Sequence, residues 1–172
     1  MNTNTTAQMN FIDPKTDRWH EVTADDALVA VPTPAPYRIL SLEQWKEVHD
    51  CWPKDLPKGL AIPNDVDIED LEADLKKFDL ISLDFPKWVD GRAYSQAHLL
   101  RARLRYVGQV RATGDVVVDM LPLLARTGFD AVQLRAGQVQ AAAERALKFF
   151  ADAGHYQGDV SDPLPLFARK AA

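Results

Sequence analysis

The amino-acid sequence predicts an α/β protein with a parallel sheet, and three observations lead to this fold class. Short apolar stretches with strand character alternate five times with segments whose apolar residues recur at helical spacing. The chain has 172 residues, which is enough for one domain with a substantial core. Along the central strands, apolar side chains share one face, and polar side chains gather on the other face.

Five strand–helix units are expected. Ser41 and Gln44 form a capping-box signature at the start of the first helix. Turns at residues 90–91 and 114–115 precede the third and fourth helices, and Pro122 predicts a kink in the fourth helix or a late start. The expected strands are residues 37–40, 59–63, 80–85, 109–113 and 130–134.

The third strand indicates which kind of parallel sheet to expect. Ile81, Leu83 and Phe85 point one way, while Ser82 and Asp84 point the other way. A doubly wound sheet is covered by helices on both faces and needs strands that are apolar almost throughout. The alternation instead fits helices on one side of the sheet and a barrel-like interior on the other. The barrel is expected to be partial, because five units fall short of the eight that close a barrel. A doubly wound five-stranded sheet is the alternative.

The chain divides into three regions. Residues 1–36 are expected to form a flexible N-terminal arm and a proline-rich connector, because they hold few apolar groups and end in alternating prolines. Residues 37–154 are the α/β domain. Residues 155–172 are expected to form an irregular C-terminal tail.

Composition excludes several classes of protein. A net charge of −5 disfavours a partner that is a nucleic acid or an anionic membrane. No apolar run approaches the roughly 18–20 residues that would span a bilayer, and the polar N-terminus does not resemble a signal peptide. We therefore expect a cytoplasmic protein. Cys51 is the single cysteine, so no internal disulfide can form.

The sequence assigns no cofactor. It has no G-x-G-x-x-G, Walker-type or G-x-S-x-G motif, which argues against a classical dinucleotide site. Flavin can bind without leaving a short motif, so it stays open. The four histidines lie on separate elements without the spacing of metal ligands, and no metal site is expected.

Ligands of parallel α/β folds bind at the carboxyl ends of the strands. Lys87 and Arg92 follow the third strand and are expected to clamp a small oxyanion beside the next helix start. Asp84 and Arg111 lie on equivalent faces of neighbouring strands and are expected to form an ion pair, either structural or functional. No catalytic residue is assigned. The expected anion- or ligand-binding residues are Lys87, Asp90, Arg92, Ser95, Arg111, Asp115 and Arg135.

Simpler interpretations stand beside these. The 90–91 dipeptide also suits a plain turn, and Ser95 a helix cap. Asp115 suits an N-cap better than a general base. Arg101 and Arg105 are expected to lie on a solvated helix face.

One set of stretches carries a family resemblance: residues 85–87, 90–95, 99–101, 111–116 and 128–130, together with Asp119. These stretches resemble a bacterial family, the domain-of-unknown-function family 934, whose members are often labelled as oxidoreductases of sulfite reduction. The resemblance covers roughly residues 37–150 and is strongest over residues 80–130. Thr127 stands where the family commonly has Cys, which argues against a thiol role at that position.

The resemblance implies a pathway but no mechanism. Family members are encoded beside assimilatory sulfite reductase, which implies an accessory protein of sulfate or sulfite reduction with sulfite reductase as its partner. Two alternatives stay open: a partial-barrel enzyme that acts on a small anionic substrate, such as an oxidoreductase, and a scaffold without a small-molecule site. A homodimer is expected, because an open sheet leaves edges and one face to be covered.

Overall fold

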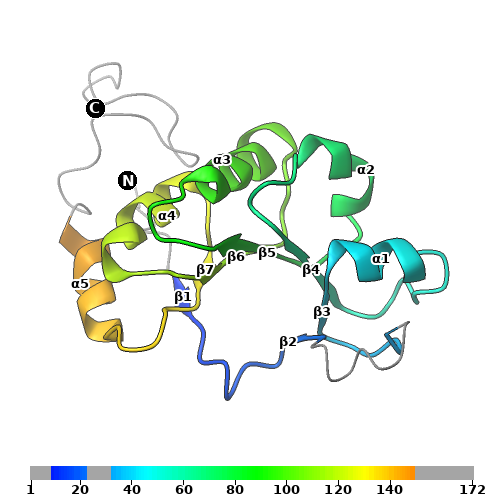
Figure 1. The fold of residues 1–172 in the computed structure, drawn as a ribbon, viewed down its shortest axis with the longest axis horizontal. Helices are drawn as coiled ribbons and strands as arrows, with labels where there is room; N and C mark the ends of the chain where they lie inside the picture. The colour runs from blue at the N-terminus through cyan, green and yellow to red at the C-terminus, as the bar shows by residue number, and fades with distance from the viewer. Residues whose placement is uncertain (1–8, 23–31, 150–172) are drawn as a thin grey trace, which may run out of the picture.

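Seven strands form one parallel sheet that curls into a half-barrel, in the order β1-β7-β6-β5-β4-β3-β2 (Figure 1). The structure is a computed structural model that describes residues 9–22 and 32–149. Its helices lie along the outer, convex side of the sheet (Figure 1). The predicted partial-barrel α/β class is therefore confirmed, and the doubly wound alternative is not what the chain adopts.

All five predicted strands are present, and neighbouring strands pair in parallel. The last of them is shorter than predicted, although the Gln133 N–H still donates to the Ala112 carbonyl at 2.9 Å beyond its end. The strands are β3 (Arg38–Leu40), β4 (Lys58–Ile62), β5 (Leu80–Phe85), β6 (Gln109–Gly114) and β7 (Ala131–Val132).

Two further strands come from the N-terminal arm, and the sequence analysis did not predict them. β1 (Asn10–Phe11) pairs with β7, and β2 (His20–Glu21) pairs with β3. Because β7 and β3 lie near opposite edges of the sheet, residues 12–19 cross its inner, concave side (Figure 1). We call residues 12–19 the strap.

The first and third helices begin where the sequence signals place them, whereas the fourth begins later than the predicted N-cap Asp115. The Ser41 hydroxyl accepts from the Gln44 N–H at 3.2 Å, and the Gln44 side chain accepts from the Ser41 N–H at 2.8 Å. Pro122 lies in the first turn of α4, so the predicted late start is confirmed. The helices are α1 (Leu42–Val48), α2 (Glu72–Leu75), α3 (Arg92–His98), α4 (Leu121–Thr127) and α5 (Gln140–Phe149).

Single turns extend three of these helices. The 3₁₀ turns Glu69–Leu71 and Val118–Met120 precede α2 and α4, and a π-helical turn at Leu99–Arg103 continues α3. Within the described ranges, none of the helices has the length and apolar character that crossing a bilayer requires.

The core lies between the helices and the outer face of the sheet. Ile81, Leu83 and Phe85 are fully buried in it, as the alternation along the third strand predicts. Ser82 and Asp84 face the inner side, where Arg111 also lies. The curled sheet therefore separates the apolar outer layer from an inner face that carries Ser82, Asp84 and Arg111 beside apolar residues such as Leu80.

Candidate functional site

The carboxyl ends of β5, β6 and β7 are joined by one carboxylate. Asp115 accepts a hydrogen bond from the Trp88 N–H at 3.0 Å, and Arg135 Nη1 donates to its other oxygen at 2.7 Å. The Asp115 N–H donates to the Phe85 carbonyl at 2.7 Å. Asp115 thus fastens the loops that follow three neighbouring strands, and we call this assembly the strand-end rim.

The charge of Asp115 is part of this fastening. The Trp88 N–H, and after it the Arg135 guanidinium, lower the pKa of the carboxyl below its ordinary value. An ionised carboxylate is therefore favoured at the point where the three loops meet. The structure brings together two residues that the sequence predicts to bind a ligand, Asp115 and Arg135. Each of them balances part of the charge of the other.

Asp90 and Arg92 also bind each other. Arg92 Nη2 donates to one oxygen of Asp90 at 2.8 Å, and Arg92 Nε donates to the other at 3.1 Å. The Arg92 guanidinium holds the pKa of Asp90 far below its usual range. The charge of Arg92 is consequently balanced within its own loop. Lys87, by contrast, is exposed and forms no ion pair with any residue in the described ranges. The Ser95 side chain is also exposed.

Arg111 has a different partner from the predicted one. Its Nη1 lies 2.5 Å from a carboxylate oxygen of Asp17 in the strap, and both side chains are buried. The parallel register places Ser82 opposite Arg111, whereas Asp84 lies opposite Thr113, one step nearer the strand ends. The predicted Asp84–Arg111 ion pair therefore does not form in this structure.

Asp84 is left at the mouth of the half-barrel, close to the carboxyl end of β5. No hydrogen bond or ion pair joins its carboxylate to another described residue, and burial raises its pKa. Beside it, the hydroxyls of Ser82 and Thr113 lie 3.1 Å apart. The sequence predicts Asp84 as the ion-pair partner of Arg111, in a structural or a functional role, and not as a ligand-binding residue. The signal it offered was an acidic residue on the polar face, one position before the end of a central strand.

Residues 59–167 match the family described as "Bacterial protein of unknown function (DUF934)". The chain belongs to this family. No curated protein matches it. The DUF934 match includes Asp84, Arg111 and the whole strand-end rim, whereas the strap that carries Asp17 lies outside it.

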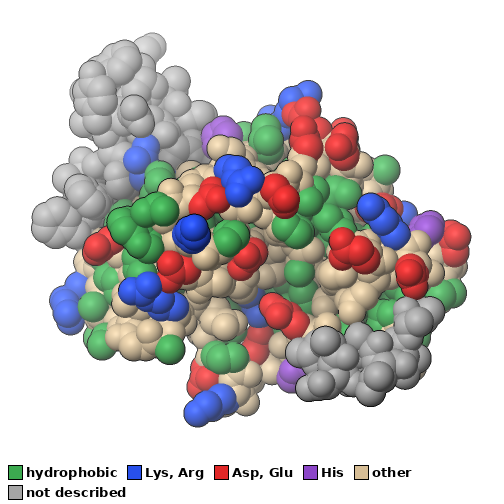
Figure 2. All heavy atoms as spheres, viewed as in Figure 1, with side chains coloured by type: hydrophobic (Ala, Val, Ile, Leu, Met, Phe, Trp, Pro, Cys, Tyr) green, Lys and Arg blue, Asp and Glu red, His purple; other side chains and the backbone are tan. Residues whose placement is uncertain are grey.

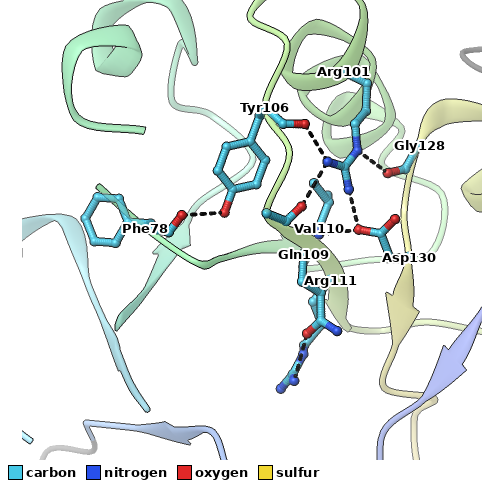
Figure 3. A network of polar contacts seen from close by, with 9 residues as sticks. Phe78, Arg101, Tyr106, Gln109, Val110, Arg111, Gly128 and Asp130 are labelled. Atoms are coloured by element: carbon cyan, nitrogen blue, oxygen red, sulfur yellow. Dashed lines mark hydrogen bonds and ion pairs between the residues drawn. The ribbon is translucent and has the colours of Figure 1, made fainter. Parts of the chain in front are cut away.

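A second polar cluster of this DUF934 protein lies at the opposite end of the sheet (Figure 3). Arg101 pairs with Asp130 and donates to the carbonyls of Tyr106, Gly108 and Gly128 at 2.6–3.0 Å. Its side chain is 16% exposed. The expectation of a solvated face is therefore wrong for Arg101, whereas Arg105 is exposed as predicted.

Figure 2 shows Lys and Arg side chains interspersed with Asp and Glu side chains over one face of the molecule. In residues 9–22 and 32–149, no three His, Cys, Asp or Glu side chains gather in a way that could hold a metal ion. The chemistry that these residues offer is proton transfer at Asp84 and charge pairing at Lys87.

Proposed function

We propose that this DUF934 protein is a cytoplasmic accessory protein of assimilatory sulfite reduction, which acts with sulfite reductase and binds a small anion at the strand-end rim. The pathway rests on the family resemblance. The observation that supports the anion site is the bond between the Trp88 N–H and Asp115, because it ties the loop that carries Lys87 to the mouth where Asp84 lies.

The charges of the rim suggest how such an anion would bind. Arg92 and Arg135 already pair with Asp90 and Asp115, so Lys87 is the cation that remains to attract the ligand. Hydrogen sulfite is both an anion and a weak acid. The ammonium group of Lys87 can pair with the negative charge of hydrogen sulfite. The Asp84 carboxyl, whose pKa is raised, can share the acidic proton of the same ion.

One observation favours an enzyme that acts on a small anionic substrate. Asp84 is a carboxylate without a described partner, and it lies close to the carboxyl end of a central parallel strand. This is where enzymes with βα barrels hold their catalytic groups, and a shifted pKa is typical of a general acid or base. In this second proposal Asp84 exchanges a proton with the substrate.

Another observation favours a scaffold that binds sulfite reductase without a small ligand. Trp88 and Val89 are adjacent on the strand-end rim, and they are 56% and 65% exposed. Exposed aromatic residues are enriched where proteins bind each other. In this third proposal the two side chains contact the reductase directly.

Calorimetry with sulfite tests the anion site. We expect the full chain to bind sulfite in a saturable manner, and chloride at equal ionic strength to produce no such signal. Lys87→Gln should weaken binding about tenfold, as expected for one lost charge pair of about 1.4 kcal/mol. Lys76→Gln is the matched control, because Lys76 is equally exposed but lies at the end of α2. Equal binding by the two variants would refute the role of Lys87.

A pull-down with purified sulfite reductase tests the partner. The accessory protein and the scaffold should both retain the reductase, whereas the independent enzyme should not. Trp88→Ala together with Val89→Ala should abolish retention if the rim is the contact surface. Leu123→Ala is a suitable control, because Leu123 is an exposed apolar residue of α4.

We also propose that the protein forms a homodimer. Its sheet does not close on itself, and the edge strands β1 and β2 have two residues each. Open sheet edges invite pairing with another chain, and two-fold dimers are the commonest closed assembly. Sedimentation at micromolar concentration should then give twice the chain mass, and a single species near 19.2 kDa would contradict the proposal.

A further inference from the structure

The strap is held mainly at its two ends. β1 joins it to one side of the sheet and β2 to the other, and each of these strands has only two residues (Figure 1). Between them, residues 13–16 are exposed. Segments with few buried contacts open at low cost in free energy. The strap can therefore leave the inner face without unfolding the core beneath the helices.

One side chain of the strap reaches the middle of the sheet. The Asp17 carboxylate contacts Arg111 Nη1 at 2.5 Å, and the two side chains are 11% and 4% exposed. Arg111 Nη2 also donates to the Gln109 side chain at 3.2 Å. Arg111 Nε, however, is buried and has no hydrogen-bond partner. The guanidinium thus has a buried donor that its present partners leave unused.

Small residues flank Arg111 on the neighbouring strands. The register places Ser82 of β5 and Ala131 of β7 directly beside Arg111 on the two neighbouring strands. Both are buried. Thr113 follows two positions later on the same face of β6. If Asp17 moves away, Arg111 Nη1 loses its carboxylate partner and becomes free to bind an oxyanion of similar size.

We propose that Arg111 anchors a binding site for a small oxyanion and that Asp17 is its built-in occupant, which the ligand displaces. Arginine pairs with planar or tetrahedral oxyanions through two parallel donors. Displacement of Asp17 frees Nη1, which lies beside Nη2 at the end of the guanidinium, and Nε is a further donor without a partner. Arg111 lies inside the stretch that matches the family, whereas Asp17 comes from outside it. The inference goes beyond the proposed function, because this site is separate from the strand-end rim, and it rests on the proposed function for sulfite as the ligand.

The simpler explanation is that the pair only fastens the strap. A buried ion pair is a weak source of stability, because desolvation of both charges offsets most of their attraction. A fastening role also does not require an unused donor on Arg111. In the proposed role, the strap competes with the ligand, and binding of the ligand releases the strap.

Limited proteolysis of the wild-type chain tests the release. Lys15 and Arg18 are exposed trypsin sites in the strap. Saturating sulfite or acetate should increase cleavage after these residues about tenfold, and chloride at equal ionic strength should not. Acetate is included because it matches the Asp17 carboxylate without being specific to sulfur chemistry. A cleavage rate that neither anion changes would overturn the inference.

Calorimetry with sulfite tests the competition. Asp17→Asn should bind sulfite about tenfold more tightly than the wild type, because an internal carboxylate at high effective concentration no longer competes. Asp13→Asn makes the same change of charge in the strap away from Arg111 and should leave the affinity unchanged. Adding Arg111→Gln to Asp17→Asn should remove the gain. No gain in Asp17→Asn would overturn the inference.

The experiments can refute the proposed site at Lys87 and the proposed site at Arg111 independently of each other. Suppose that Lys87→Gln weakens sulfite binding while Asp17→Asn leaves it unchanged: the strand-end site then stands and the strap inference falls. Suppose instead that Asp17→Asn tightens binding while Lys87→Gln has no effect: the ligand then binds at Arg111, and the role proposed for the rim is wrong.

Discussion

Arg101 and Asp130 form an ion pair where β6 and β7 begin, at the end of the sheet opposite the strand-end rim (Figure 3). The same Asp130 oxygen accepts from the Val110 N–H at 2.8 Å. Arg101 in turn satisfies carbonyls of the two segments that lead into these strands. The pair therefore fixes how the chain enters the sheet.

Arg101→Met should destabilise the protein by roughly 2–4 kcal/mol in a urea titration, because it leaves three carbonyls and a carboxylate without their shared donor. Arg103→Met is the matched control. Arg103 pairs with Glu69 at the surface, where its side chain is 65% exposed, and such pairs contribute less than about 1 kcal/mol. Similar losses for the two variants would show that the Arg101 cluster is not structural.

Gly114→Ala should be far more destabilising than Gly137→Ala. Both glycines have positive φ, of 87° and 85°, so alanine costs each of them about 1–2 kcal/mol of backbone strain. A methyl group on Gly114 would also lie 2.5 Å from an oxygen of Asp84 and from the Phe85 carbonyl, whereas one on Gly137 would meet nothing within 4 Å. Overpacking should add about 1–3 kcal/mol at Gly114 alone. Equal urea midpoints would contradict this.

Lys58→Met should cost about 1–3 kcal/mol, because three carbonyls lose a buried donor. Lys58 Nζ donates to the carbonyls of Pro53, Lys54 and Leu56 at 3.0–3.4 Å, at the start of β4. Burial lowers its pKa, so desolvation opposes part of this gain. Lys54→Met, at an exposed position of the same loop, should change the urea midpoint little. A midpoint for Lys58→Met equal to that of the wild type would show that the three bonds give no net stabilisation.

The half-barrel could be predicted because its signals are local. Alternation along β5 separates Ile81 and Leu83 from Ser82 and Asp84, and this alone distinguishes a one-sided sheet from a doubly wound one. The capping box at Ser41 likewise depends on residues three positions apart. Patterns of this kind are visible in any sequence that carries them.

The strap could not be predicted in this way. Strands of two residues show no alternation, so β1 and β2 are formed by backbone hydrogen bonds that leave no pattern in the side chains. Asp17 lies 94 residues before Arg111, and no local rule pairs them. The sequence predicts Asp84 as the partner instead, because it shows which face of each strand a residue occupies but not the exact register of the strands.

The sequence also could not predict which charged side chains of the strand-end rim pair with each other. The loops contain the predicted residues, but whether Arg92 binds a ligand or Asp90 depends on loop conformation. Arg101 was misassigned for a related reason. Its spacing from Arg105 suggests one continuous helix face, yet the helix ends in a π-helical turn, and Arg105 reverses the chain with φ at 55°. The reversal brings the carbonyls of residues 106 and 108 to Arg101.

Asp84→Asn should stabilise the protein at neutral pH. Burial disfavours the charged carboxylate and raises its pKa in the folded state above the ordinary value of 3.8. Between these two pKa values the folded chain keeps a proton that the unfolded chain has lost, so stability falls as the pH rises through that interval. Above the folded-state pKa, the full free-energy cost of burying the charged carboxylate remains, and an asparagine at this position avoids that cost.

The gain should therefore be present at pH 7 and shrink toward zero as the pH falls below about 3.8, where both forms are neutral. Because solvent reaches Asp84 and screens its charge, the gain should be about 0.5 kcal/mol. Asp119→Asn, at an exposed position, should give no gain that depends on pH in this way. Urea titrations at several pH values measure the difference. A loss of stability at pH 7 would show that Asp84 has a stabilising partner, and it would remove the physical argument that this carboxylate is kept for a ligand.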